Sequence, residues 1–151
     1  MPTHSETREL PYTAQQMYDL VADVASYPEF LPWTAAARIK SREDMGDHEV
    51  MDADLVISFK VFRERFTSRV VLWPEARKID TEYLDGPFKY MKSNWGFEDI
   101  GDDKCKIHFF VDFEFKNAIL QKIIGVVFNE AMQRVVRAFE KRAAVLYGAG
   151  A

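Results

Sequence analysis

The feature that most constrains the fold is an alternation of apolar and polar residues that runs from residue 34 to residue 115. It forms about six runs, including 51–59 and 105–115, and short turns such as 85–87 separate them. Successive side chains of a strand point to opposite faces, so each run presents one apolar face. One buried face per strand is typical of antiparallel sheets. The pattern therefore predicts an antiparallel meander with a single core side.

A long amphipathic helix is predicted after the strands, from about Asn117 to Tyr147, because this stretch holds no proline. At 100° per residue its apolar side chains share one stripe. The stripe consists of Leu120, Ile124, Phe128, Ala131, Val135, Phe139 and Leu146. Before the meander we expect a short strand at 3–10, a helix ending near Asp23 and an aromatic turn at 27–33. This order predicts an α+β helix-grip fold, in which a curved antiparallel sheet wraps around the C-terminal helix.

The start of the first helix has a recognisable capping box. Thr13 is followed three residues later by Gln16, and Met17, Leu20 and Val21 then recur at helical spacing. In such a box each of the two side chains accepts a hydrogen bond from the backbone N–H of the other residue. These hydrogen bonds fix where the helix begins.

Length and composition bound the class of protein. The 151 residues fit one domain, and the single Cys105 excludes an intrachain disulfide. No secretory signal precedes the fold, and no run approaches the roughly 20 apolar residues that span a bilayer. We expect a cytoplasmic protein, with peripheral binding to the inner face of a membrane as an open option.

Charge is distributed unevenly along the chain. The net charge of −4 argues against a general DNA binder. Residues 116–147 hold six basic and two acidic side chains, so this segment is positive and the remainder is strongly negative. Two interpretations stay open: the helix neutralises the body beneath it, or it steers one face toward an anionic surface.

The inward faces of the strands mix large and small side chains. Bulky members are Phe59, Phe66, Trp95, Phe97, Phe109 and Phe113, and small ones are Ala53, Ser68, Thr81 and Ser93. Apolar walls with a few hydrogen-bonding groups are the usual composition of a small-molecule pocket. The pattern favours an internal apolar cavity, and the alternative is a solid core in which neighbouring side chains fill the gaps.

The inward faces carry almost no group that could act as an acid, base, nucleophile or metal ligand. Four carboxylates, Asp52, Asp54, Asp112 and Glu114, alternate outward and are interpreted as solvated. The histidines lie far apart without metal-ligand spacing, although a meeting of His4 with an acidic group stays open. No phosphate loop or nucleophile elbow occurs. We therefore expect a non-enzymatic protein with no catalytic residues, metal or cofactor.

The first half of the long helix is apolar nearly all round. Ile119, Ile123 and Val126 lie opposite the stripe, and Val61 and Phe62 are expected at the tip of a neighbouring hairpin. Residues 27–33 or that hairpin would cover the helix in one interpretation. In the other, these five residues form an exposed membrane-docking surface beside the cavity mouth, with basic side chains close by.

Several short motifs resemble one known family. They are YPEFLPW at 27–33, FTSRV at 66–70, GPF at 86–88 with W-x-F at 95–97, FEF at 113–115 and AF-x-x-RA at 138–143. In this order they resemble the coenzyme Q-binding branch of the START-like (polyketide cyclase/dehydrase) superfamily, whose bacterial members include the ribosome association toxin RatA. The resemblance covers nearly the whole chain and implies a single START-like domain over residues 1–151.

The resemblance implies binding of ubiquinone or a similar polyprenyl lipid in the cavity, as a carrier or chaperone that supports respiratory electron transport. It also implies transient visits to a membrane surface. Motif 27–33 would form the cavity wall or lid, and a structural corner is the alternative role for Trp33 and the two prolines. Motif 27–33 and the inward faces together give the expected ligand contacts. These are Tyr27, Phe30, Leu31, Trp33, Phe59, Phe66, Ser68, Met91, Trp95, Phe109, Ile124 and Phe128.

Two other functions were weighed against lipid binding. The RatA resemblance implies a ribosome partner and a block of subunit association, for which the basic face of the last helix would contact phosphates. A cyclase-type enzyme is disfavoured by the missing inward acid–base pair.

Overall fold

The computed structural model describes residues 3–59 and 62–148, and it leaves the side chains of Phe59 and Phe62 undescribed. Seven strands form one antiparallel sheet in the order β1-β7-β6-β5-β4-β3-β2. The strands are β1 (Thr3–Leu10), β2 (Thr34–Asp44), β3 (Glu49–Phe59), β4 (Phe62–Trp73), β5 (Lys78–Asp85), β6 (Phe88–Gly101) and β7 (Lys104–Phe115). Six of them fall between residues 34 and 115, so the predicted meander is confirmed.

The strand register brings the apolar faces together. Met51 of β3 lies opposite Val70 of β4, and Leu55 lies opposite Phe66. Because side chains alternate along a strand, a slip of one residue would turn the apolar set of β3 to the other face. The match of the two patterns therefore fixes this pairing.

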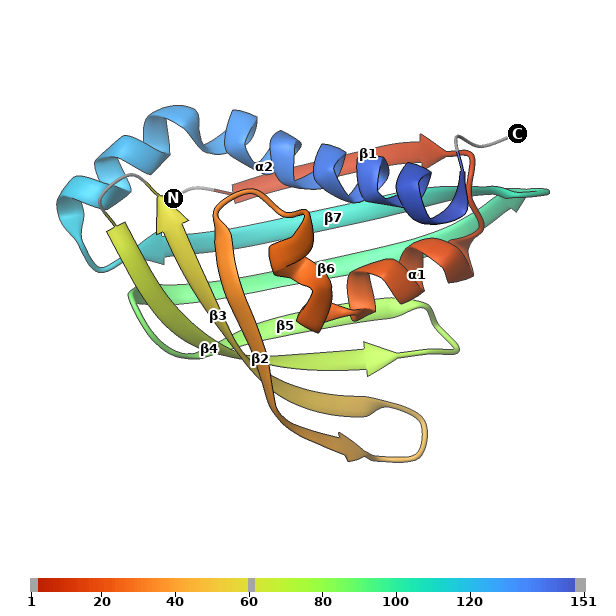
Figure 1. Cartoon of the computed structure of the whole chain (residues 1–151), viewed down its shortest axis with the longest axis horizontal. Helices are drawn as coiled ribbons and strands as arrows, with labels where there is room; N and C mark the ends of the chain where they lie inside the picture. Colours follow the sequence, from red (N-terminus) through yellow and green to blue (C-terminus); the bar gives the residue numbers. More distant parts are fainter. Residues whose placement is uncertain (1–2, 60–61, 149–151) are drawn as a thin grey trace.

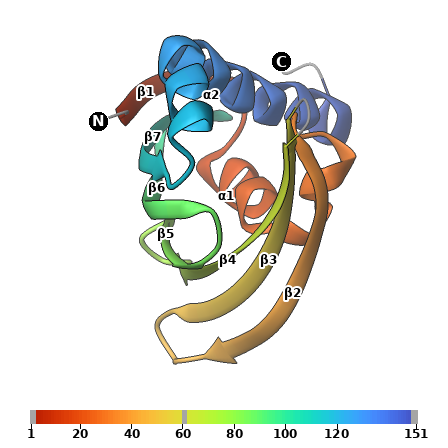
Figure 2. The same cartoon turned by 90° about the vertical axis from the view of Figure 1, so that its left-hand side faces the viewer.

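The sheet curves around α2 (Ala118–Tyr147), which lies along its concave side (Figures 1 and 2). Irregularities in register interrupt β2 between Thr34 and Ala36 and β6 between Phe88 and Tyr90. Bulges of this kind bend a strand and increase its twist. They allow a long sheet to bend around the helix, which is the predicted helix-grip arrangement.

Two short helical elements follow β1. Helix α1 (Ala14–Ala22) begins with the predicted capping box, in which Thr13 and Gln16 each accept a hydrogen bond from the other's backbone N–H. Its buried Tyr18 packs edge-on against Phe97 of β6. The 3-10 helix η1 (Val24–Glu29) then leads into β2. The aromatic turn expected at 27–33 thus begins inside η1 and ends directly before β2.

Helix α2 begins where the sequence predicts. The side chain of Asn117 accepts hydrogen bonds from the N–H groups of Ile119 and Leu120, which caps the first turn. At the other end, the Tyr147 hydroxyl donates to the backbone carbonyl of Gln16, joining α2 to α1. The cap and this contact set the two ends of the helix across the concave face.

Two details correct the expectation from sequence. Leu146 is 50% exposed although it belongs to the predicted stripe, and the last buried residues of α2 are Phe139 and Ala143. Asp54 points outward as expected but is buried, and it accepts a hydrogen bond from Thr67 of β4. A central strand has neighbours on both sides, whose side chains cover the carboxylate.

The turn before β6 gives a stability prediction. Gly86 has φ +143°, and a Cβ added there would lie 2.5 Å from Phe66 Cβ. We expect Gly86→Ala to lower the free energy of unfolding by about 1–3 kcal/mol, because the contact would force β4 and the turn apart. Gly101→Ala is the matched control, since φ is +159° there and nothing lies within 4 Å. Equal urea midpoints for the two variants would show that the contact with Phe66 is unimportant.

Candidate functional site: a cavity between sheet and helix

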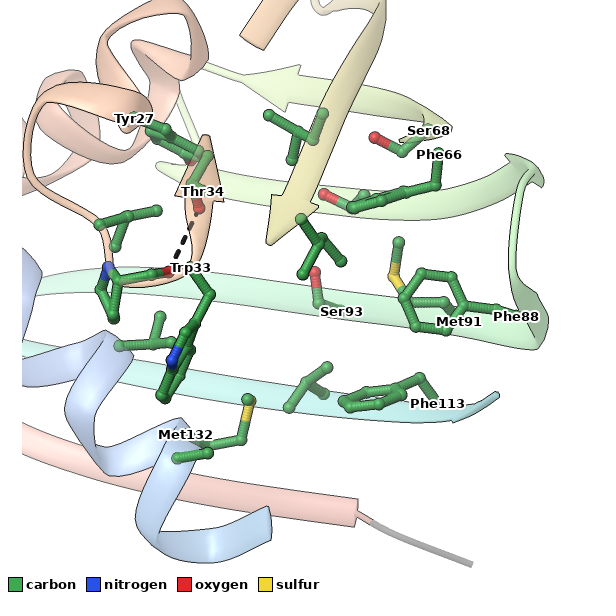
Figure 3. A pocket seen from close by; sticks show the side chains of 18 of the residues that line it. Tyr27, Trp33, Thr34, Phe66, Ser68, Phe88, Met91, Ser93, Phe113 and Met132 are labelled. Atoms are coloured by element: carbon green, nitrogen blue, oxygen red, sulfur yellow. Dashed lines mark hydrogen bonds between the residues drawn. The ribbon is translucent and has the colours of Figure 1, made fainter. Parts of the chain in front are cut away.

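An internal cavity of about 500 Å³ lies between the concave face of the sheet and α2. Its walls come from η1 and the turn after it, from strands β2 to β7 and from α2 (Figure 3). This volume falls in the range of sites for small organic ligands. The predicted internal cavity is therefore present, and the alternative of a solid core is excluded.

The cavity walls are mainly apolar and aromatic. The Trp95 ring stacks on Phe109 with centroids 4.3 Å apart, and it meets Phe139 of α2 edge-on at 5.2 Å. Phe66, Phe88 and Phe113 continue this wall along the sheet. Interlocked rings of this kind are stiff, so the cavity keeps its shape without a ligand.

Polar groups divide into an inner set and an outer set. Ser68, Thr81 and Ser93 line the cavity from three neighbouring strands. The charged residues of the lining are Glu64, Glu130 and Arg134, and all three are exposed to solvent. The site is therefore uncharged inside and charged at its rim.

Tyr27 is a cavity residue whose hydroxyl is already engaged. It donates to the backbone carbonyl of Val21. Burial, together with the nearby carboxylate of Asp23, raises the pKa of this phenol above its ordinary value. Tyr27 therefore stays neutral and serves the cavity as an apolar ring.

Trp33 stands at the mouth of the cavity. Its backbone has φ +62°, a left-handed conformation that is unusual for a bulky residue. Its carbonyl accepts a hydrogen bond from the N–H of Ser58 on β3, and its ring reaches toward Met132 of α2 (Figure 3). Trp33 thus combines both roles weighed from the sequence, a structural corner and a piece of the cavity wall.

Nine of the twelve residues expected to contact a ligand line this cavity. They are Tyr27, Leu31, Trp33, Phe66, Ser68, Met91, Trp95, Phe109 and Ile124. Their contact with a ligand remains a prediction. The side chain of Phe59 lies outside the described residues.

Phe30 and Phe128 lie outside the lining, which corrects the expectation for both. Phe30 packs edge-on against Phe139, with the Arg142 guanidinium 5.3 Å from its ring centroid. Phe128 packs between Phe113 and His4. Both rings fill the space between α2 and its supports.

Phe88 is a lining residue that the alternation pattern missed. Its ring stacks on Phe115 at 4.7 Å and meets Phe66 edge-on at 5.2 Å. Counting by twos from Met91 assigns Phe88 to the outer face. The register irregularity between Phe88 and Tyr90 returns it to the inner one. The GPF motif could have indicated this inward position, because it places Phe88 directly after a turn, where a bulge can shift the register.

The first half of α2 carries an exposed apolar surface beside the mouth. Ile119 is 71% exposed and Val126 is 83% exposed, and Ile123 and Val127 extend the same face. Val127 also lines the cavity, so this surface borders the opening. Ile119, Ile123 and Val126 are therefore exposed in the structure, and their docking on a membrane stays a prediction. Val61 and the side chain of Phe62 lie outside the described residues, so their part in this surface remains a prediction.

A polar network joins β1 to α2, and the residue pattern hardly predicts it. The buried His4 contacts Glu6 through Nε2 at 2.8 Å and Asn129 through Nδ1 at 3.2 Å. Arg8 donates to Glu6 and to Glu140 of α2. His4 thus meets an acidic group, the arrangement left open above. The His4 ring and its partners lie between β1 and α2, outside the cavity lining. The network therefore holds α2 in place.

This network gives a pH prediction. Burial opposes ionisation of Glu6, but hydrogen bonds from His4 and Arg8 outweigh it and lower the pKa below its ordinary 4.5. The unfolded chain then takes up a proton at higher pH than the folded one, so stability falls as pH drops through 4.5 and below. We expect Glu6→Gln to cost about 1 kcal/mol at pH 7 and less at pH 3. Urea unfolding at both pH values measures this. Glu9→Gln, at an exposed β1 position, is the control, and equal costs at both pH values would contradict the assignment.

The described residues hold no site for metal chemistry. No cluster of three or more His, Cys, Asp or Glu side chains in residues 3–59 and 62–148 has the arrangement of a metal site. Neither α1 nor α2 is long and apolar enough to cross a bilayer. What the geometry offers is an apolar cavity that is open at its mouth and has hydroxyl groups on its wall.

Comparison with known proteins gives the family. The model of the family "Polyketide cyclase / dehydrase and lipid transport" matches residues 10–140. The chain belongs to this family. Within it, the ribosome association toxin RatA of Rickettsia prowazekii (strain Madrid E) is 40% identical over 146 residues, which cover 95% of this chain and 97% of that protein.

Two further similar proteins extend the comparison. A mitochondrial coenzyme Q-binding protein of Xenopus laevis, COQ10 homolog B, is 32% identical over 149 residues, covering 96% of this chain and 59% of that protein. The solution structure of an 18 kDa protein from Caulobacter crescentus is 36% identical, with a TM-score of 0.81 and coverage of 99% and 100%. The resemblance to the RatA and COQ10-like branch of the START-like proteins is confirmed.

Proposed function

We propose that this protein binds an uncharged lipid of the ubiquinone class in its cavity and carries it in support of respiratory electron transport. The observation that carries the proposal is the 500 Å³ apolar cavity whose charged residues are confined to the rim. An ionised ligand buried among Trp95, Phe109 and Phe139 would lose its hydration without gaining a partner. A neutral ring with an apolar tail meets no such cost. A long tail exceeds the cavity and would leave through the mouth beside Trp33.

The binding is proposed to be non-enzymatic. The family description includes enzymes as well as lipid transport, so membership leaves the choice open. The lining supports the choice, because its carboxylates and its guanidinium are exposed at the rim, and Ser68, Thr81 and Ser93 add only hydroxyl groups that do not titrate near neutral pH. General acid–base catalysis needs a titratable group within hydrogen-bond reach of the reacting atom.

Lipid exchange is proposed to take place at the membrane surface. Ile119, Ile123, Val126 and Val127 form an apolar face that borders the mouth, and the exposed Lys116 and Lys122 lie beside it. An apolar face flanked by cations suits shallow docking on anionic lipid. The protein would thus work in the cytoplasm and at the inner face of a membrane.

Extraction of the purified protein tests the proposal. The protein would be prepared from a quinone-containing host, extracted with organic solvent and analysed by mass spectrometry, with an equal amount of an unrelated protein as the control. We expect near-stoichiometric quinone. A lipid-free protein that also takes up no added quinone would remove the proposal.

Ribosome association is the second candidate, and the name of the Rickettsia relative favours it. Helix α2 supports it as well, because Lys122, Arg137 and Lys141 are exposed on it and Arg134 is exposed at the cavity rim. Exposed cations on one helix suit phosphate contacts, which weaken steeply with salt. In sucrose gradients, added protein should shift whole ribosomes to free subunits, and replacing the four cations with glutamine should abolish the shift. Unchanged profiles with the unmodified protein would eliminate this candidate.

A further inference from the structure

Three hydroxyl groups form a row on the inner face of the sheet. Thr81 of β5 lies directly opposite Ser93 of β6. Thr81 also pairs with Val70 of β4, and Ser68 is two residues from Val70 on the same face. Directly opposite side chains have Cβ atoms about 5 Å apart, and diagonal neighbours about 7 Å. The three hydroxyls therefore cross three strands in a continuous line.

The row faces the cavity and is not used by the fold. All three residues line the cavity, and Figure 3 shows the hydroxyls of Ser68 and Ser93 directed into it. Within the described part of the chain, none of the three hydroxyls has a hydrogen-bond partner. Ser68 is 2% exposed, so its hydroxyl depends on whatever occupies the cavity.

We propose that Ser68, Thr81 and Ser93 form the head-group subsite of the cavity and recognise an uncharged ring that carries carbonyl or hydroxyl oxygens. The proposal rests on the function proposed above and specifies which end of the ligand binds where. The ring enters first and lies over β4, β5 and β6. The tail points back toward Trp33 and α2.

The chemistry of the row selects the class of head group. A serine or threonine hydroxyl both donates and accepts a hydrogen bond. It therefore satisfies a carbonyl oxygen and a hydroxyl equally, so the oxidised and reduced forms of such a ring both fit. A phosphate or carboxylate head would find no cation here, because Arg134 lies at the rim.

The position of the charges sets the orientation. Glu64, Glu130 and Arg134 are exposed at the opening, whereas Ser68 is buried on the sheet and Thr81 and Ser93 are only partly exposed. If the tail entered first, the hydroxyls would face methylene groups and stay without partners, which is unfavourable. Entry of the head satisfies them and leaves an apolar chain against the apolar residues of the mouth.

Two probes with the same short alkyl tail test the subsite. One ends in a substituted benzoquinone and the other in an unsubstituted phenyl ring, and calorimetric titration measures both affinities. The unmodified protein should bind the quinone at least about tenfold more tightly, since each hydrogen bond contributes about threefold to tenfold. The triple variant Ser68→Ala, Thr81→Val, Ser93→Ala should lose that preference and bind the phenyl probe unchanged. Ser5→Ala, which removes an exposed hydroxyl of β1, should alter neither affinity.

The outcomes separate this proposal from the proposed function. If the unmodified protein binds both probes and the triple variant leaves the quinone preference intact, the subsite is wrong and lipid binding stands. If the unmodified protein binds neither probe, both proposals fail. Thermal unfolding checks the folding of the triple variant. If the triple variant unfolds, Ser93→Ala alone provides the test, with a loss of at least about threefold in quinone affinity expected.

Discussion

Phe139→Ala is expected to lower the free energy of unfolding by about 3–5 kcal/mol. Phe139 is fully buried on α2 and meets three rings edge-on, those of Tyr27 at 5.4 Å, Phe30 at 5.3 Å and Trp95 at 5.2 Å. Its side chain therefore joins the helix to the turn after η1 and to the centre of the sheet. Alanine removes these contacts and leaves a hole that rigid neighbours do not fill.

Urea denaturation followed by tryptophan fluorescence measures this effect. Val145→Ala is the matched control on the same helix, because Val145 is exposed and its truncation should change stability by no more than about 0.5 kcal/mol. Phe139 also lines the cavity, so the variant should hold its ligand less tightly. A loss below about 1 kcal/mol would mean that the ring cluster does not anchor α2.

The double variant Ile119→Asp, Val126→Asp is expected to reduce binding to anionic liposomes by more than about tenfold. Burying an isoleucine or valine side chain contributes about 1.5–3 kcal/mol, and a carboxylate placed there is repelled by the lipid head groups. Both side chains point to solvent in the isolated protein, so folding should be little affected. The loss should therefore appear in docking and in the rate of lipid exchange rather than in stability.

The opposite end of the same helix supplies the control. Val145 and Leu146 are also exposed and apolar, and they lie more than four turns from Ile123 along α2. Val145→Asp with Leu146→Asp introduces the same two charges away from the mouth, and sedimentation with liposomes should stay as in the unmodified protein. If both double variants lose binding equally, net charge and not the surface beside the mouth governs attachment. If the first variant binds as well as the unmodified protein, the surface does not dock on membranes.

The sequence determined the frame of this fold because the frame depends on local periodicity. Alternation at 51–59 and 105–115 assigns strands and their inner faces, and the capping box of Thr13 and Gln16 marks the start of α1. These signals arise from neighbours a few residues apart, where spacing on a strand or helix is fixed by backbone geometry. Most of the cavity wall followed from the same rule, since an inner face is known once its strand is known.

Where the local rule failed, a contact distant in sequence was responsible. Phe88 faces inward because a bulge shifts the register of β6. Phe30 lies outside the lining because it packs against Phe139 and Arg142. Asp54 is buried by Thr67 across a strand pair, although its position in the alternation predicts a solvated carboxylate. The sequence pattern alone does not decide whether such a side chain is buried or solvated, because that depends on strand pairing and packing.

What the sequence by itself determined is a curved sheet, a covering helix and an uncharged apolar interior. The tertiary structure alone decided that His4, Glu6 and Arg8 reach across to α2, and that Ile119 and Val126 stay uncovered beside the mouth. It also placed Ser68, Thr81 and Ser93 in one row without internal partners. The physical reason is that periodicity states which way a side chain points, whereas its neighbours depend on strand register and on where the helix rests.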